Sequence, residues 1–183
     1  MNKNNNKESS LESLPLPSTE TLADFADIRH GFEIAGHRFL VPEGIYSELT
    51  SRTEICAIPD TPSFFLGFIN HRGETLPVFS LERLLLKDSE TMGRWILLID
   101  KGTRTIGILL NSYPRTLNDL KAKNNIAAEG ERIEPDKAIN DEVFELFSGA
   151  TFMYHSETWR EFDHRRFCEY GKRNFINPKR AES

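Results

Sequence analysis

Four side chains near the C-terminus form the densest group in this sequence that could do covalent chemistry. They are His155, Asp163, His164 and Cys168. A cysteine activated by a histidine base can act as a nucleophile in a hydrolase, and a reactive thiol can serve a redox protein. Successive residues of an extended chain point to opposite faces, however, so Asp163 and His164 are expected to diverge. Cys168 also lies among apolar and basic neighbours that are typical of a packed helix. A hydrolase or redox protein that uses His155, His164 and Cys168 therefore stays open as the less favoured alternative.

Other signatures of enzymes and metal proteins are missing from the sequence. It contains no Gly-x-Ser-x-Gly elbow, no Walker-type phosphate loop and no Gly-x-Gly-x-x-Gly turn. The spacing from His155 to His164 fits none of the usual patterns of zinc ligands. The two cysteines, Cys56 and Cys168, are too few for a disulfide framework and are expected to be reduced thiols. We therefore predict no catalytic residue, no metal and no cofactor, which leaves a protein that acts by binding other proteins.

Composition and charge disfavour nucleic acid and membranes as binding partners. The net charge of -5 disfavours general binding to nucleic acid or to an anionic membrane. The longest uninterrupted apolar stretch, Trp95 to Ile99, is far shorter than the roughly 20 residues that cross a bilayer. The first 20 residues lack the apolar centre of a signal peptide and are rich in Asn, Ser and Pro. We expect a cytoplasmic protein that binds no nucleic acid and does not insert into a membrane.

The elements that would position any site are mostly short strands, because apolar residues alternate over short stretches that end at Gly or Pro. Residues 43–51 are expected to be an irregular crossover, and residues 118–136 a long surface loop. The expected strands are 32–34, 39–41, 53–58, 67–70, 75–79, 94–100, 105–110, 149–155 and 159–163. The expected helices are 63–66, begun by Asp60 and Pro62, 81–86, capped by Ser80, and 164–170. This pattern predicts an all-β fold, either a sandwich or a pair of barrels.

The chain divides into three parts on composition. Residues 1–30 are expected to be a disordered tail, residues 31–170 one folded domain, and residues 171–183 a basic C-terminal tail. The basic residues toward that end are expected to form a solvated surface. They are Arg160, Arg165, Arg166, Lys172, Arg173, Lys179 and Arg180.

One run of the sequence carries a recognisable family motif. It reads Thr-Pro-Ser-Phe-Phe-Leu-Gly-Phe-Ile-Asn-His-Arg-Gly-Glu-Thr-Leu-Pro-Val from Thr61 to Val78. This run resembles the CheW family at every fixed position of the family pattern, with His71 in place of the usual leucine. The resemblance implies two five-stranded SH3-like β-barrel subdomains around a shared apolar core, with one or two short helices. It also implies an adaptor that couples the cytoplasmic tip of a methyl-accepting chemoreceptor to the regulatory domain of a CheA-type histidine kinase.

The same resemblance points to the residues of a binding site. Family members pair the arginine of this motif with a glutamate 24 residues earlier, and here these positions are Arg72 and Glu48. The pair either fixes the receptor groove or only stabilises the fold. Tyr46 and Ile45 are expected to contact the receptor helix in a groove. Three further residues of the run permit close backbone approach, turn geometry or local hydrogen bonds, and they are either structural or part of the binding site. They are Gly67, Asn70 and Gly73.

Several positions depart from the family pattern and bear on the pathway rather than the fold. Ser80 replaces an acidic residue, and residues 110–113 replace a Val-Asp-Gly-Val sequence. The ending Trp159-x-x-Phe162-Asp163 is similar to PilI-type paralogs of the type IV pilus system, which controls twitching motility. A degenerate member that has lost one interface and competes with an intact adaptor also stays open. We expect recruitment to membrane receptor arrays in either pathway.

Overall fold

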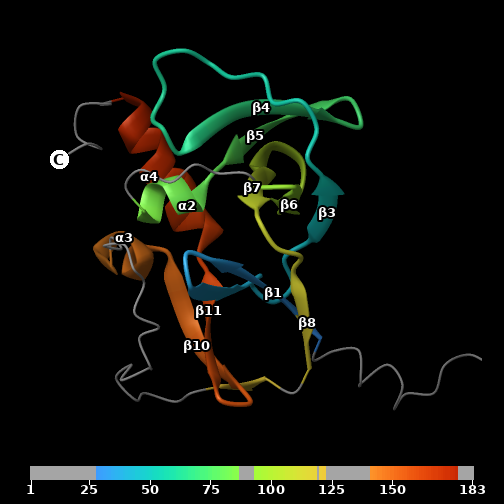
Figure 1. The fold of residues 1–183 in the computed structure, drawn as a ribbon, viewed down its shortest axis with the longest axis vertical. Helices are drawn as coiled ribbons and strands as arrows, with labels where there is room; N and C mark the ends of the chain where they lie inside the picture. The colour runs from blue at the N-terminus through green and yellow to red at the C-terminus, as the bar shows by residue number, and fades with distance from the viewer. Residues whose placement is uncertain (1–27, 87–92, 119, 123–140, 177–183) are drawn as a thin grey trace, which may run out of the picture.

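The computed structural model of the protein describes residues 28–86, 93–118, 120–122 and 141–176. Two β-sheets lie one above the other, and the helices gather along one side of them (Figure 1). The strands of the lower sheet are not consecutive in sequence. The first two strands and the last two belong to the lower sheet, and the central hairpins belong to the upper one. The chain therefore leaves the lower sheet, builds the upper sheet and returns.

The lower sheet has six strands in the order β8-β1-β2-β11-β10-β9, in which β11 pairs with β2 in parallel and all other pairs are antiparallel. Its two edge strands, β8 and β9, are separated in sequence by residues 118–120 alone. Because an extended residue spans roughly 3.5 Å, these two edges must lie close together, so the sheet curls into a small barrel. The strands are β1 (Arg29–Ile34), β2 (His37–Leu40), β8 (Arg115–Leu117), β9 (Lys121–Ala122), β10 (Ser148–Tyr154) and β11 (Glu157–Phe162).

The upper sheet has five strands in the order β3-β6-β7-β5-β4. An isolated antiparallel bridge between Cys56 and Phe68 brings the chain that follows β3 against β4, which closes this sheet too. The backbone of Cys56 donates to Phe68 at 2.8 Å and accepts from it at 3.0 Å. The strands are β3 (Ser47–Ser51), β4 (Phe65–His71), β5 (Glu74–Phe79), β6 (Trp95–Ile99) and β7 (Ile106–Leu110).

Short helices connect the strands and cover the gap between the sheets. The N-terminus of α2 (Leu81–Leu85) is capped by Ser80, whose hydroxyl accepts a hydrogen bond from the backbone N–H of Arg83 at 3.2 Å. The 3-10 helix η1 (Gly102–Arg104) joins β6 to β7, α3 (Asp141–Leu146) precedes β10, and α4 (His164–Ile176) follows β11. None of the helices among the described residues has the length and apolar character that crossing a membrane requires.

The buried apolar side chains form three clusters, because successive residues of a strand point to opposite faces of its sheet. Along β6, Ile96 and Leu98 point into the upper barrel, whereas Leu97 and Ile99 point into a larger cluster between the two sheets. The lower barrel has a small core of its own, made of Leu40, Leu117 and Trp159. The larger cluster is shared by both sheets and the three α-helices, so the two barrels form one folding unit. Its buried aromatic members are Phe32, Phe39, Phe64, Phe65, Phe79, Phe144, Phe147, Phe162 and Phe167.

The expected all-β fold of two small barrels around a shared core is confirmed, and the differences are local. The lower sheet has a sixth strand, β9, within the segment that was expected to be a loop. The remainder of that loop prediction, residues 119 and 123–136, lies outside the described residues. The described residues contain three α-helices, whereas the resemblance implied one or two. The helices α2 and α4 lie where they were expected, α3 was not predicted, and α4 continues past Tyr170 to Ile176.

Three further element predictions are wrong: the irregular crossover over residues 43–51, which contains β3, the strand over residues 53–58 and the helix over residues 63–66. The strand after the first hairpin is β3 at residues 47–51 rather than 53–58, because its backbone pairs with the apolar strand β6 although Leu49 is its only large apolar residue. The helix expected over residues 63–66 does not form. Asp60 adopts a positive φ of 57° in a turn instead of capping a helix, and the backbone N–H of Phe65 bonds to Pro62 at 2.9 Å as strand β4 begins.

Candidate functional site

The β4–β5 hairpin presents Arg72 at its tip. His71 and Glu74 face each other across the strands, which leaves Arg72 and Gly73 as a two-residue turn. Both have a positive φ, 52° and 84°, as a type I′ turn requires. The side-chain oxygen of Asn70 accepts a hydrogen bond from the Gly73 N–H at 3.2 Å. The turn is therefore fixed by backbone geometry and by Asn70, and the Arg72 side chain remains 72% exposed.

Glu48 at the start of β3 collects three donors on one carboxylate. Its Oε1 lies 2.7 Å from Nη2 of Arg72 and 3.2 Å from Nε2 of His71, and its Oε2 accepts a hydrogen bond from the Tyr46 hydroxyl at 3.0 Å. The distance from Nε2 of His71 suits a hydrogen bond donated by the His71 tautomer that carries its hydrogen on Nε2. The Glu48–Arg72 pair that the family resemblance implied is thus formed, and His71 is a third member that the sequence did not reveal.

Tyr46 connects this cluster to the β6–β7 connection. The ammonium of Lys101 lies 4.4 Å from the centroid of the Tyr46 ring, a cation–π distance. The backbone N–H of Asp100 donates to the Tyr46 carbonyl at 2.9 Å. Ile45 is half-buried and packs against the large shared core. The two residues expected to contact a partner helix therefore differ, because only Tyr46 has a largely exposed side chain.

Asp100 is the buried charge beneath this surface. Its Oδ1 accepts the backbone N–H of Lys101 at 2.8 Å, and its Oδ2 lies 3.3 Å from Nε2 of His164 and 3.4 Å from Nε of Arg104. Burial by itself raises the pKa of a carboxyl group. Here the hydrogen bonds from Lys101 and His164 and the positive charge of Arg104 outweigh that effect, and the pKa of Asp100 lies below its ordinary value.

Gly67 has a structural role that the geometry makes explicit. Its φ is 128°, and a Cβ atom built on it would lie 2.1 Å from the carbonyl oxygen of Cys56. Any other residue would push apart the Cys56–Phe68 bridge that closes the upper barrel. Gly67, Asn70 and Gly73 therefore build the hairpin that carries Arg72.

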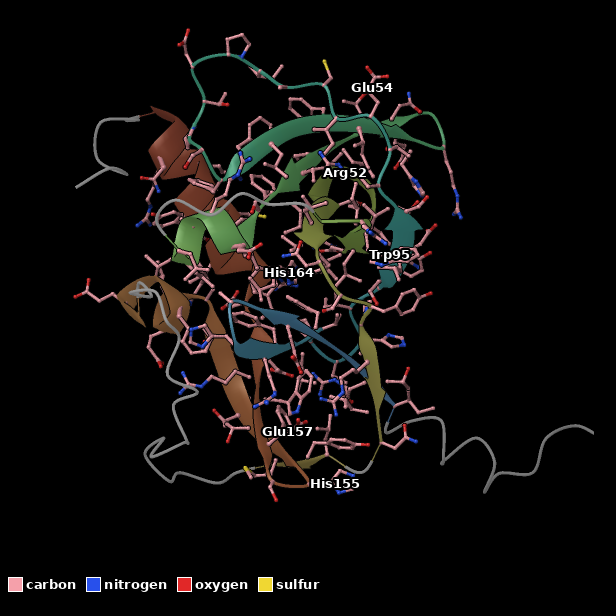
Figure 2. The ribbon with its side chains drawn as sticks, viewed as in Figure 1. Arg52, Glu54, Trp95, His155, Glu157 and His164 are labelled. Carbon is pink, nitrogen blue, oxygen red and sulfur yellow. The ribbon has the colours of Figure 1, made fainter. Side chains whose placement is uncertain are left out.

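The residues of the enzyme alternative do not come together. His155 occupies the exposed turn at the far end of the β10–β11 hairpin, whereas His164 lies near the middle of the molecule (Figure 2). Cys168 follows His164 by one turn of α4, but burial is the largest influence on its thiol and raises the pKa above its ordinary value. A raised pKa is the opposite of nucleophile activation. No group of three or more His, Cys, Asp or Glu side chains arranged to hold a metal ion occurs among the described residues.

Comparisons with known proteins agree with this picture. The sequence profile of the CheW-like domain family matches residues 30–153. Protein FrzA of Myxococcus xanthus is 37% identical over 62 residues, which are 34% of this chain and 39% of FrzA, well under half of its length. The probable chemotaxis protein CheW of Rhizobium etli is 26% identical over 119 residues, which are 64% of this chain and 71% of that protein.

A solved structure gives the same result for the fold. The crystal structure of the scaffolding protein TtCheW from Thermoanaerobacter tengcongensis superimposes with a TM-score of 0.52, at 14% sequence identity, over 75% of this chain and 88% of that one. At this level of identity the likeness concerns the fold.

Proposed function

Because the chain belongs to the CheW-like domain family, which its residues 30–153 match, we propose that it is a non-catalytic adaptor in a chemosensory pathway. In this role it couples the cytoplasmic tip of a methyl-accepting chemoreceptor to the regulatory domain of a CheA-type histidine kinase. The sequence similarity to the probable chemotaxis protein CheW of Rhizobium etli supports this class of function. His155 lies apart from His164 (Figure 2), and burial raises the pKa of the Cys168 thiol, so these residues do not support a nucleophilic site.

One observation carries the proposal, namely the way in which Glu48 holds Arg72. An ion pair with so exposed an arginine contributes only about 0–1 kcal/mol to folding. Stability therefore does not account for a guanidinium that is set on a fixed turn and held by a carboxylate with two further donors. An arginine that is oriented but still open to solvent is suited to bind a partner.

We assign the receptor contact to the surface that contains Glu48, Arg72 and Tyr46, and to the half-buried Ile45 that precedes Tyr46 in the chain. An amphipathic helix at a receptor tip can lay its apolar face there, in the helix-in-groove mode. The kinase regulatory domain then binds a separate barrel end. Both contacts place the protein in the cytoplasm at receptor arrays, and they involve neither nucleic acid nor insertion into a membrane.

The proposal extends to the pathway in which the adaptor acts. We place the protein in a pilus-type system that controls twitching motility, on the similarity of its Trp159-x-x-Phe162-Asp163 ending to PilI-type paralogs. In the fold, Trp159 and Phe162 are fully buried and Asp163 accepts a hydrogen bond from the Arg166 N–H in the first turn of α4. The ending therefore supports the fold directly and marks the pathway only through that similarity. Loss of twitching with normal swimming in a deletion strain is the expected result, and the reverse would contradict this assignment.

The adaptor function is tested by titration calorimetry of the full chain with a receptor cytoplasmic fragment and a kinase regulatory domain from the same organism. We expect binding to both, and loss of binding to at least one in Arg72→Glu. Arg173→Glu, a charge reversal at an exposed position on α4, is the matched control. Unchanged affinity of Arg72→Glu for both partners would refute the role of Arg72. Binding of the wild type to only one partner would instead identify a degenerate competitor that lacks one interface.

A further inference from the structure

Two ion pairs on this face share the same arrangement. In the first pair the Glu48 side chain is 20% exposed and Arg72 is 72% exposed. In the second, Asp100 is 7% exposed and Arg104 is 68% exposed. In both pairs the carboxylate is covered and the guanidinium faces solvent. Two carboxylates thus hold cations at the surface while presenting little negative charge of their own.

Contacts with Tyr46 connect the two pairs. The exposed Tyr46 lies between them, since its hydroxyl bonds Glu48 and its carbonyl accepts the backbone N–H of Asp100. Lys101, also exposed, places its ammonium over the Tyr46 ring and follows Asp100 directly in the chain. The backbone N–H of Arg104 bonds back to the Lys101 carbonyl at 3.4 Å. We call Tyr46, Arg72, Lys101 and Arg104 the cationic patch.

The cationic patch is opposite in sign to the protein as a whole, whose net charge is -5. It offers three exposed cations and one aromatic ring that is itself 42% exposed. Its three cationic groups are held by different contacts, with Glu48, with the Tyr46 ring and with Asp100. They are therefore suited to several carboxylates along a polypeptide rather than to one phosphate. So few cations would also add only weak attraction to an anionic membrane, about 1 kcal/mol for each basic residue near its surface.

We propose that the cationic patch binds an acidic segment of the receptor's cytoplasmic tip. Carboxylate side chains of that segment pair with Arg72, Lys101 and Arg104, and an apolar side chain between them packs on the Tyr46 ring. This inference rests on the proposed adaptor function and goes beyond it, because it names the chemistry of the partner and adds Lys101 and Arg104 to the interface. Charge complementarity of this kind mainly raises the rate of association and makes it sensitive to salt.

The test measures association of the full chain with the receptor fragment and with the kinase regulatory domain by surface plasmon resonance, at about 50 and about 300 mM NaCl. The variant Lys101→Gln/Arg104→Gln removes two cations and keeps their stems. A second variant, Lys101→Glu, leaves the Arg104–Asp100 pair intact. It therefore tests the patch even if the first variant fails to fold. Arg165→Gln/Lys172→Gln on the exposed face of α4 is the matched control.

We expect both patch variants to bind the receptor fragment at least about tenfold more weakly at low salt, with a smaller salt effect than the wild type, and the control to stay within about twofold. A loss confined to the kinase regulatory domain would overturn the inference. Patch variants that bind both partners as the wild type does, while Arg72→Glu loses binding, overturn this inference and leave the adaptor function standing. A wild-type chain that binds neither partner refutes both. Binding to phosphatidylglycerol vesicles that the patch variants abolish would identify a membrane as the occupant and also overturn the inference.

Discussion

Oδ2 of Asp100 lies 3.3 Å from Nε2 of His164, and both side chains are buried. Asp100 directly follows strand β6 of the upper sheet, and His164 is the first residue of α4, which follows the last strand of the lower sheet. This contact therefore ties the loop beneath the cationic patch to the helix that packs against the shared core. Because Asp100 also donates its N–H to the Tyr46 carbonyl, the same residue supports the surface of the proposed partner site.

Asp100 makes the stability of the fold depend on pH in the acid range. Its pKa is lower in the folded protein than in the unfolded chain, so the folded state binds fewer protons. The contribution is fully present above the ordinary pKa of about 3.9 and is lost as pH falls through the lower folded-state value. We expect Asp100→Asn to lower the free energy of unfolding by about 1–3 kcal/mol at pH 7. Urea unfolding at a series of pH values should show this difference shrinking below about pH 4.

The control for that experiment is Asp163→Asn, a half-buried carboxylate at the start of α4. It removes a carboxylate charge that pairs with Arg166, keeps an oxygen that can accept the Arg166 N–H, and leaves the Asp100–His164 contact in place. If the free energies of unfolding of the wild type and of Asp100→Asn differ by the same amount from pH 7 to pH 3, the role assigned to the Asp100 charge is contradicted.

Substitution of Gly67 should open the upper barrel. Gly67→Ala places a Cβ against the Cys56 carbonyl and also forces a positive φ on alanine. We expect a loss of more than about 2 kcal/mol in the free energy of unfolding. Gly44→Ala is the matched control, since Gly44 also has a positive φ, of 71°, but no atom lies within 4 Å of its added Cβ. Its cost should be about 1 kcal/mol, and equal losses in the two variants would show that φ alone explains the effect.

Removal of the Glu48 charge should weaken partner binding more than it weakens the fold. Glu48→Gln keeps the shape of the side chain but loses the charge that holds the Arg72 guanidinium at 2.7 Å. Because that pair is largely exposed on the arginine side, the free energy of unfolding should change by no more than about 1 kcal/mol. Affinity for the partner that depends on Arg72 should fall by about three- to tenfold, measured by titration calorimetry.

Tyr46→Phe provides the comparison for Glu48→Gln. It removes the hydroxyl donor to Glu48 and retains the ring beneath Lys101. Its effect on affinity should be smaller than that of Glu48→Gln. A larger effect would mean that the Tyr46 hydroxyl, rather than the Glu48–Arg72 pair, contacts the partner.

The sequence could predict those parts of the fold that depend on local chemistry. The turn at Arg72 and Gly73, the Ser80 cap and the hairpin around residues 101–104 all follow from short-range patterns. Strand β3 could not be predicted in this way, because Leu49 is its only large apolar residue and its extended state comes from pairing with β6. The same holds for the bridge at Cys56, which forms because Gly67 allows the two backbones to approach.

Only part of the candidate site could be predicted from the sequence, for the same reason. The family motif located Arg72 and its partner Glu48, although they are 24 residues apart. It gave no signal for Lys101, Asp100 or Arg104, because these join the site only when β6 pairs with β3 and brings the end of β6 beside Tyr46. His71 was visible as an unusual residue, but its contact with Glu48 depends on how β3 approaches the hairpin tip. Contacts between strands that are distant in sequence depend on the tertiary fold, so short-range sequence patterns cannot predict them.

The thiol of Cys168 should react slowly, which separates an adaptor from the redox alternative. Burial raises its pKa, so at pH 7.5 a smaller fraction is thiolate than in an ordinary cysteine, and only the thiolate attacks a disulfide reagent. Access is also restricted, because Cys168 packs against the shared core. The exposed Cys56 provides an internal comparison in the same chain. With a chromogenic disulfide reagent, Cys56→Ala should react at least about tenfold more slowly than Cys168→Ala. A faster reaction at Cys168 than in a free peptide cysteine would require an activating partner, and Asp100 cannot serve as one, since its negative charge raises the pKa of the thiol further.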